Sequence, residues 1–277
     1  MKGKQVVITG PTSGIGKEIA MGLGAFGAEL VLGCRDVARG KQTAEEITRR
    51  TGVKSISVMH IDTSSQQSIR DFARRYRDEH SRLDVLVNNA GMNRGMHPRE
   101  SSVDGVELTF ATNVLGYFLL TRELLYLLKA SAPARVVNVA SSFASDLDLD
   151  DLQFERRTFD SAKAYAQSKA CNRMLTWALA RWLEQSGVTA NAMAPGLVAE
   201  TGLYRHAPPE LITRLRQRSD RTSAQGADTA VWLASSPDVE GVSGKFFGDR
   251  KEIECEFRNT EAEEKLWSIC ERLVGSA

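Results

Sequence analysis

A strand, a glycine-rich turn and a helix follow one another at the start of the chain, and this succession restricts the fold more than any other feature. Gln5–Thr9 is a short apolar run rich in β-branched residues, which is typical of a buried strand. Gly10, Gly14 and Gly16 follow, and the helical pattern continues to residue 24. Such a unit favours an α/β fold in which the turn holds the pyrophosphate of a dinucleotide.

Each glycine of this turn has a separate expected role. Gly10 allows the tight turn, Gly14 lets the backbone approach a pyrophosphate, and Gly16 lets the helix pack closely on the sheet. Ser13 and Ile15 stand where the free N–H groups at the start of the helix would face phosphates. The alternative is a glycine-rich turn that binds no ligand.

A basic residue directly follows the second predicted strand, Glu29–Cys34. Arg35 would pair with a 2′-phosphate, the group that distinguishes NADP from NAD. Asp36 stands about 20 positions past the glycine motif, where an acidic residue would hold the ribose hydroxyls of NAD. Because the strand ends at Cys34, Asp36 is better placed to cap the helix predicted over Val37–Thr51. The sequence therefore favours NADP, with NAD as the alternative.

Two further strands, predicted over 55–61 and 83–88, alternate with a charge-rich amphipathic helix over 66–79. Repeated strand–helix units with short connections predict a Rossmann-type, doubly wound parallel sheet with helices on both faces. Ligands of such sheets bind where the strands end. The residues at those ends are therefore candidate cofactor contacts: Asp62, Thr63, Asn89, Ala90 and Gly91.

Tyr165 and Lys169 lie one helical turn apart in a stretch with a helical pattern over 162–184. Residues at this spacing face the same side of a helix. An isolated phenol has a pKa of about 10, and an ammonium group one turn away favours the phenolate and lowers that pKa. The pair is a candidate acid and base for a hydroxyl or carbonyl substrate, although such pairs also occur on solvated helices.

Composition excludes several classes of function. The net charge of +1 over 277 residues argues against nucleic-acid or membrane-surface binding through bulk charge. The four cysteines lack metal-ligand spacing, and nothing suggests a disulfide framework, so no metal is expected. We find no signal peptide and no apolar window long enough for a membrane span. A cytoplasmic protein is expected.

Taken together, the motifs resemble those of the short-chain dehydrogenase/reductase family, in the family's order and over nearly the whole chain. They are Thr9-Gly10-x3-Gly14-x-Gly16, Asn88-Asn89-Ala90-Gly91, Asn113, a serine after the strand at 135–139, and Tyr165-x3-Lys169. Within the family, several stretches are similar to the retinol-dehydrogenase-like branch, in which an arginine after the second strand commonly accompanies NADP. These stretches are Cys34–Asp36, Thr112–Thr121, Val231–Pro237 and Gly241–Phe247.

The resemblance implies roles for single residues. Asn113 would hold a water that extends a proton path from Lys169, and Lys169 would also bind the nicotinamide ribose. Counting from Asn138, Ser141 falls at the position of the catalytic serine, with Ser142 as the alternative.

The turn after the sixth predicted strand would lie beside the nicotinamide, with Pro195, Gly196 and Val198 as contacts. Here the chain departs from the family pattern. Glu200 occupies the usual threonine position, and Thr201 comes one residue later.

The remaining segments complete one predicted domain over 1–277: a core with the catalytic residues over 1–196, a substrate lid over 197–223, and a C-terminal part over 224–277. The acidic insert over 146–152 is expected to be a solvated edge, and the helix over 261–273 to pack on a sheet edge or a partner. The arginines of the lid fit an acidic substrate or a solvated helix face: Arg205, Arg214, Arg216, Arg218 and Arg221.

The sequence and the resemblance thus lead to an NADP(H)-dependent oxidoreductase. It would move a hydride between nicotinamide and a carbonyl or alcohol, for which the branch suggests a lipophilic aldehyde, ketone or alcohol. A non-catalytic NADP-binding sensor or scaffold is the alternative, and a sugar-nucleotide epimerase or dehydratase is a weaker one. The family resemblance also implies a possible homodimer or homotetramer.

Overall fold

The computed structural model describes residues 1–204, 207–219 and 221–275. Within these residues the centre is an eight-stranded sheet in the order β3-β2-β1-β4-β5-β6-β7-β8, parallel except for the pairing of β7 with β8. The strands are β1 (Gln5–Thr9), β2 (Glu29–Cys34), β3 (Ile56–His60), β4 (Val85–Asn88), β5 (Ala134–Val139), β6 (Val188–Met193), β7 (Phe246–Gly248) and β8 (Lys251–Glu252).

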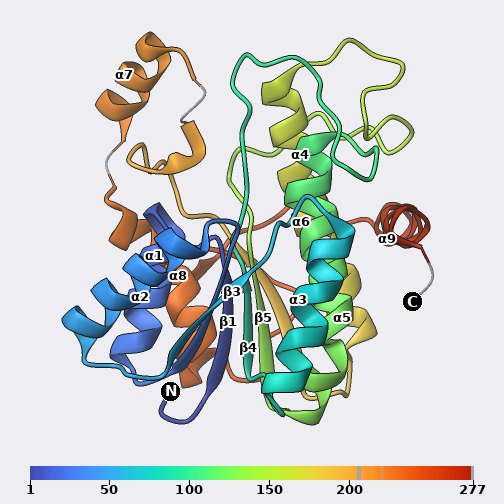
Figure 1. Ribbon diagram of the computed structural model, residues 1–277. Helices are drawn as coiled ribbons and strands as arrows, with labels where there is room; N and C mark the ends of the chain where they lie inside the picture. The colour runs from blue at the N-terminus through green and yellow to red at the C-terminus, as the bar shows by residue number, and fades with distance from the viewer. Residues whose placement is uncertain (205–206, 220, 276–277) are drawn as a thin grey trace.

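Helices cover both faces of the sheet (Figure 1). One layer contains α1 (Gly14–Ala25), α2 (Val37–Thr51) and α8 (Ser223–Ser235). The other contains α3 (Gln66–Glu79), α4 (Leu108–Phe110), a π-helical turn (Ala111–Leu115), α5 (Gly116–Ala130) and α6 (Ser161–Trp182). The predicted doubly wound α/β fold and its single domain are confirmed.

The central strands β1, β4, β5 and β6 are buried on both sides, and successive side chains enter different apolar clusters. Val6 and Ile8 of β1 pack in the cluster with α1 and α8, whereas Val7 packs in the cluster with α3 and α5. Continuous apolar runs of this kind are characteristic of parallel sheets. The sheet is therefore a rigid support for the loops at its carboxyl edge.

Asp36 begins α2 as its N-cap, and its side chain accepts a hydrogen bond from the main-chain N–H of Arg39 at 3.0 Å. This confirms the predicted capping role. Asp160 caps α6 in the same way, through the N–H of Lys163 at 3.0 Å. The helix that carries Tyr165 and Lys169 thus has a fixed starting point.

The expectation of a solvated edge over 146–152 is wrong for the end of that insert. Asp151 and Leu152 are buried. The Asp151 carboxylate accepts hydrogen bonds from three consecutive main-chain N–H groups, those of Glu155, Arg156 and Arg157. An aspartate that closes its own loop in this way satisfies buried backbone donors, which a count of charges does not show.

The last helix, α9 (Thr260–Val274), packs on α6. Its Trp267 stacks on Trp182 with ring centroids 5.3 Å apart, and its Glu263 pairs with Arg181. Figure 1 shows α9 beyond α6, away from the middle of the sheet. The homodimer or homotetramer implied by the resemblance stays a prediction, and one that paired through α6 would have to form around this helix.

The segment proposed as a lid contains the short turn Gly202–Tyr204 and the helix α7 (Pro209–Arg218), none of whose residues is buried. Arg221 forms an ion pair with Asp249. Arg205, His206 and Asp220 lie outside the described residues. In the described part of the chain, no helix combines the length and apolar character that crossing a bilayer requires.

Candidate active site

The residues singled out by the sequence gather at one edge of the sheet, because parallel strands all end on the same side. Gly10 follows β1, Arg35 follows β2, Asn89 follows β4, and Ser141 comes shortly after β5. The turn at Pro195 follows β6 in the same way. This carboxyl edge is where open α/β sheets bind their ligands.

The glycine turn leaves no room for side chains at two of its positions. A Cβ on Gly10 would lie 2.9 Å from the Cα of Ala90, and one on Gly16 would lie 2.3 Å from the carbonyl oxygen of Gly10. Gly10 and Gly14 also have positive φ angles, of 66° and 55°, which glycine adopts without strain. The Ser13 side chain makes no capping hydrogen bond, so the first turn of α1 presents bare backbone to the space above it.

Asn89 and Ala90 join the end of β4 to the glycine turn. The main-chain N–H groups of both residues donate to the Thr9 hydroxyl at 3.0 Å, and the Asn89 amide donates to the carbonyls of Thr9 and Gly10. Each of these bonds holds the turn in register with the neighbouring strand. In this structure, the side chain of Asn89 therefore stabilises the glycine turn.

Arg35 and Asp62 lie at the ends of adjacent strands, since Cys34 pairs with His60 in the sheet. Arg35 is exposed, and it makes no ion pair or hydrogen bond within the described residues. The carboxylate of Asp62 accepts from the N–H and the hydroxyl of Ser64, which fixes the loop. Thr63 is buried and packs closely against Gly116 of α5. A Cβ on Gly116 would lie 2.6 Å from the carbonyl oxygen of Thr63.

The turn after β6 lies against the start of α1. A Cβ on Gly226 of α8 would lie 2.6 Å from Val198, 3.3 Å from Ile15 and 3.4 Å from the carbonyl oxygen of Pro195. Gly226 thus lets two predicted cofactor segments meet at one point. Gly196 has a φ of 74°, a conformation that favours glycine.

Thr201 packs against the glycine turn although it stands one residue late. A Cβ on Gly14 would lie 3.2 Å from the Thr201 side chain. Glu200, at the usual threonine position, is exposed. The one-residue shift therefore still leaves a threonine beside the turn.

Tyr165 is buried on the face of α6 that lies against the end of β5, and the Ser141 side chain lies near enough to lower the pKa of the phenol by hydrogen bonding. Ser142, the alternative serine, is exposed. Burial raises the pKa of Tyr165 above its ordinary value, and Tyr204 raises it further, while the hydrogen bond with Ser141 acts in the opposite direction. The geometry therefore favours Ser141 over Ser142.

Lys169 is buried one turn along α6, and its amine donates to the carbonyl of Val139 at 2.9 Å. The nitrogen lies 5.7 Å from the centre of the Tyr165 ring. Burial lowers the pKa of Lys169 to about 7. The predicted lowering of the tyrosine pKa by an ammonium is not found in the structure as it stands, because desolvation dominates both groups.

Asn113 lies in the π-helical turn and is fully buried. Its side chain forms two hydrogen bonds with the main chain of Met92 and donates to the hydroxyl of Ser168. Its own carbonyl accepts from Asn172 at 2.8 Å. A Cβ on Gly91 would lie 3.4 Å from Asn113 and 3.7 Å from the Lys169 amine, so these residues meet at one place. The water-holding role stays a prediction.

Three further residues surround this centre: the sequence analysis missed Phe143 and Arg173, whereas Tyr204 belongs to the predicted lid. Phe143 stacks on Tyr165 with ring centroids 6.5 Å apart and is 57% exposed, so it forms an apolar wall beside the hydroxyl pair. Tyr204 is close enough to affect the pKa of Tyr165. Arg173 donates to the carbonyl of Ser141. Its spacing from Tyr165 and Lys169 along one helix face was a signal available in the sequence.

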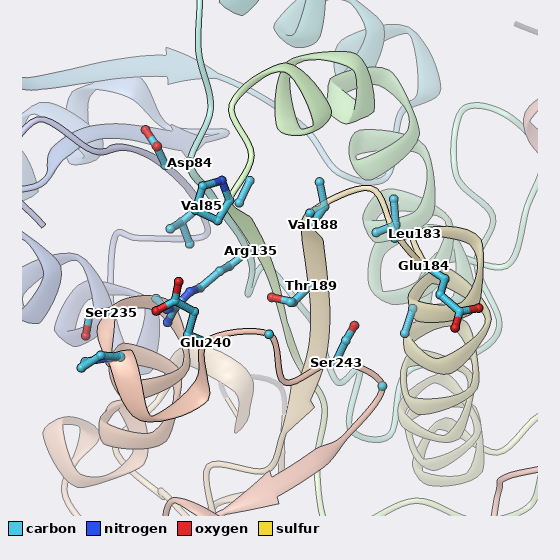
Figure 2. Close-up of a pocket in the computed structure, with 18 of the residues that line it drawn as sticks. Asp84, Val85, Arg135, Leu183, Glu184, Val188, Thr189, Ser235, Glu240 and Ser243 are labelled. Carbon is cyan, nitrogen blue, oxygen red and sulfur yellow. The ribbon is translucent and has the colours of Figure 1, made fainter.

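A separate hollow of about 850 Å³ lies at the opposite, amino edge of the sheet. Figure 2 shows its lining, with Asp84 and Val85 at the start of β4 and Arg135 at the start of β5. It contains none of the predicted site residues. The candidate catalytic residues and this hollow therefore lie at opposite ends of the same strands.

Comparison with known proteins agrees with the geometry. Residues 4–211 match the family model of the short chain dehydrogenases. The chain is 40% identical to human retinol dehydrogenase 14 and 41% identical to mouse retinol dehydrogenase 12, in each case over 99% of this chain and 87% of the relative.

Solved structures show the same fold. An uncharacterised protein from Mycobacterium Paratuberculosis superposes with a TM-score of 0.77 at 29% identity, covering 99% of this chain and 94% of that protein. The Pseudomonas aeruginosa RhlG/NADP complex superposes with a TM-score of 0.72 at 28% identity, covering 89% of this chain and 94% of that one. The chain belongs to the short-chain dehydrogenase family, and it is an NAD(P)-dependent oxidoreductase of CH–OH and C=O groups.

Proposed function

We propose that the protein is an NADP(H)-dependent enzyme that interconverts a lipophilic aldehyde or ketone and the corresponding alcohol. The observation that carries this proposal is the grouping of three side chains. Ser141 lies near enough to Tyr165 to lower the pKa of its phenol, and the buried amine of Lys169 lies 5.7 Å from the centre of the Tyr165 ring, one turn along the same helix. The names of its relatives, retinol dehydrogenases 12 and 14, support a long apolar primary alcohol or aldehyde as the substrate.

The residues at the carboxyl edge fit a dinucleotide. The bare glycine turn at the start of α1 suits a pyrophosphate, and the Asp62 loop and the turn from Pro195 to Val198 flank it. Arg35, exposed and without a partner in the described residues, suits the 2′-phosphate of NADP. A relative of known structure that contains NADP supports this preference.

The chain's own contribution to the reaction is a proton and a hydrogen bond at the substrate oxygen, while the nicotinamide, when bound, supplies or accepts the hydride. Because burial keeps the pKa of Tyr165 high, the phenol is protonated at neutral pH and donates its proton to a carbonyl oxygen. Ser141 donates a hydrogen bond to the same oxygen as its charge grows.

The substrate would lie beside aromatic side chains. Phe143 offers an exposed ring next to Tyr165, and Tyr204 lies near enough to raise the pKa of Tyr165. Aromatic walls of this kind bind apolar groups without specific polar contacts. They suit a lipophilic substrate better than a sugar nucleotide, which is the weaker alternative.

The test is the variant Tyr165→Phe, with oxidation of NADPH followed by absorbance in the presence of retinal or a long-chain aliphatic aldehyde. We expect turnover to fall by roughly 10²–10⁴-fold, while NADPH still raises the melting temperature as it does in the native protein. Tyr126→Phe is the matched control, because Tyr126 is 77% exposed on α5 and should leave turnover unchanged.

The result also separates the proposal from its main alternative. A sensor or scaffold would bind NADPH, show no turnover with any aldehyde, ketone or alcohol, and respond equally to both tyrosine variants. Turnover near the native rate in Tyr165→Phe would reject the assigned acid. The cytoplasmic location and the homodimer or homotetramer remain predictions.

A further inference from the structure

A buried arginine lies directly behind the proposed catalytic serine. Arg173 of α6 is 5% exposed, and its guanidinium donates to the main-chain carbonyl of Ser141. It stands one turn beyond Lys169 and two turns beyond Tyr165, so the three side chains share one face of the helix. The same helix face therefore presents the phenol and also contacts the backbone of the serine that bonds to it.

The remaining contacts of Arg173 are weak acceptors and aromatic rings. Its guanidinium carbon lies 4.0 Å from the centre of the Phe246 ring and 5.5 Å from that of Phe257. One of its terminal nitrogens donates to the sulfur of Cys255 at 3.5 Å, and its Nε is buried without a partner. No carboxylate forms an ion pair with it in the described residues.

Burial of a cation in such an environment is energetically unfavourable. A guanidinium removed from water loses much of its hydration, and among the described residues only rings, a sulfur and one carbonyl offset that loss. An apolar side chain would fill the space at lower cost. Residues that break the ordinary rules of burial in this way are expected at functional sites.

We propose that Arg173 is a positioning residue for the reaction. Its hydrogen bond would fix the peptide of Ser141 so that the serine hydroxyl faces Tyr165. The Ser141 hydroxyl also accepts the main-chain N–H of Phe143 at 3.0 Å, and Phe143 stacks on Tyr165. Arg173 therefore anchors the start of the segment that carries both the serine and one aromatic wall. The proposal rests on the proposed function and adds a residue to it.

The test is a double-mutant cycle of Arg173→Met and Ser141→Ala, followed in single turnovers with NADPH and a long-chain aliphatic aldehyde. We expect R173M alone to reduce the rate by roughly tenfold to a hundredfold, since displacing a reacting group by about 1 Å has effects of that size. The KM for NADPH should stay unchanged. In the S141A background the same substitution should have little further effect, because the group that it positions is gone.

Arg173→Lys supplies the rescue, because an ammonium can still donate to the Ser141 carbonyl. We expect it to recover part of the rate that R173M loses. Should R173M fail to fold, Arg173→Gln takes its place in the cycle, and R173K remains the rescue.

Arg135 provides the matched control. It is a partly buried arginine at the other end of β5, shown beside Glu240 in Figure 2, and it donates to the carbonyls of Leu233 and Ser236 at 2.9 and 2.8 Å. Arg135→Met should lower the melting temperature and leave the turnover rate as in the native protein.

The outcomes are distinct. The positioning role is refuted if R173M turns over at the native rate. It is also refuted if R173M loses as much rate in the S141A background as in the native protein. Either result leaves the proposed function intact. Full activity of Tyr165→Phe would instead reject the proposed function itself, whatever the cycle gives.

Discussion

Two equally buried charged groups lie at opposite edges of the sheet, and their surroundings differ. Asp84, at the amino edge, is 2% exposed, and its carboxylate accepts hydrogen bonds from two cationic side chains and a main-chain N–H, those of Lys4, Arg82 and Gln5. Lys169, at the carboxyl edge, is 4% exposed. Within the described residues, the one hydrogen bond of its amine goes to the carbonyl of Val139.

The difference appears in the protonation of the two groups. Burial alone would raise the pKa of Asp84, but its hydrogen bonds with Arg82, Lys4 and Gln5 hold it below the usual value. Burial lowers the pKa of Lys169 to about 7, with no partner to oppose it. The first charge is compensated and stabilises the fold, whereas the second is left able to change its charge near neutral pH, as chemistry requires.

The variant Lys169→Met tests this difference between Asp84 and Lys169 most directly. We expect turnover to fall by roughly 10²–10⁴-fold, as for other groups that take part in proton transfer. The free energy of unfolding should not fall, because an apolar side chain replaces a buried amine that lacks an acidic partner. Steady-state assays and urea unfolding measure the two effects, and a large loss of stability would contradict our reading of Lys169.

The pH dependence of stability provides a second test of the uncompensated burial of Lys169. The folded pKa of Lys169, about 7, lies below its ordinary value of 10.5, so between these values the unfolded chain binds the extra proton. Stability contributed by this residue therefore rises from about pH 7 towards 10.5, and below about 7 its full cost remains. K169M should lack this alkaline rise in urea unfolding.

Arg35 is another cation at the carboxyl edge that lacks an acidic partner in the described residues, and we predict that Arg35→Ala changes the cofactor preference. Hydrogen bonds to charged groups contribute about 1.5–3 kcal/mol, so the KM for NADPH should rise about tenfold to a hundredfold. The KM for NADH should hardly change. Initial rates with both cofactors measure this, and an equal increase for both would show that Arg35 does not contact the 2′-phosphate.

Asp36→Ala is the matched control for Arg35→Ala. Removing the N-cap of α2 should cost about 1 kcal/mol of stability, and the ratio of the two KM values should stay as in the native protein.

The smallest effect on turnover is expected from Asp84→Asn, which acts on the compensated charge. The variant should lose about 2 kcal/mol of unfolding free energy at neutral pH and keep its turnover rate. Because the folded pKa of Asp84 is depressed, its contribution is present above the unfolded pKa of about 3.9 and disappears as the pH falls through the folded value. The native and variant unfolding curves should therefore converge in acid, and a constant difference would show that the ion pairs are not the cause.

Local patterns were sufficient to predict most of the fold. The helices over Val37–Thr51 and Gln66–Glu79 have the predicted bounds, because a cap and an apolar stripe determine each of them within its own segment. The glycine motif and the Tyr165–Lys169 spacing likewise depend on neighbours in the sequence. The structure brings these predicted residues to one edge of the sheet, which follows from the parallel topology.

The predictions that failed depend on contacts between distant segments. The insert at Asp151 looked solvated because its backbone partners were not visible in the composition. Likewise, the pKa of Tyr165 depends on its burial in the folded chain and on the charge effect of Tyr204, which comes from a separate segment. Spacing showed that Lys169 shares a helix face with the phenol, but it did not show that the amine is desolvated.

The π-helical turn Ala111–Leu115 adds one residue to the winding that joins α4 to α5. Removing a single residue there would rewind the turn as an α-helix. The segments on either side would stay in register, because the wide turn absorbs the extra residue, but side chains within the turn would change direction by up to about 100°. Asn113 would then swing away from Met92 and Ser168, whatever the composition of the shortened segment. This stretch is consequently constrained by its length more than by its side chains, and single-residue deletions within it should be tolerated far less well than substitutions between apolar residues at its ends.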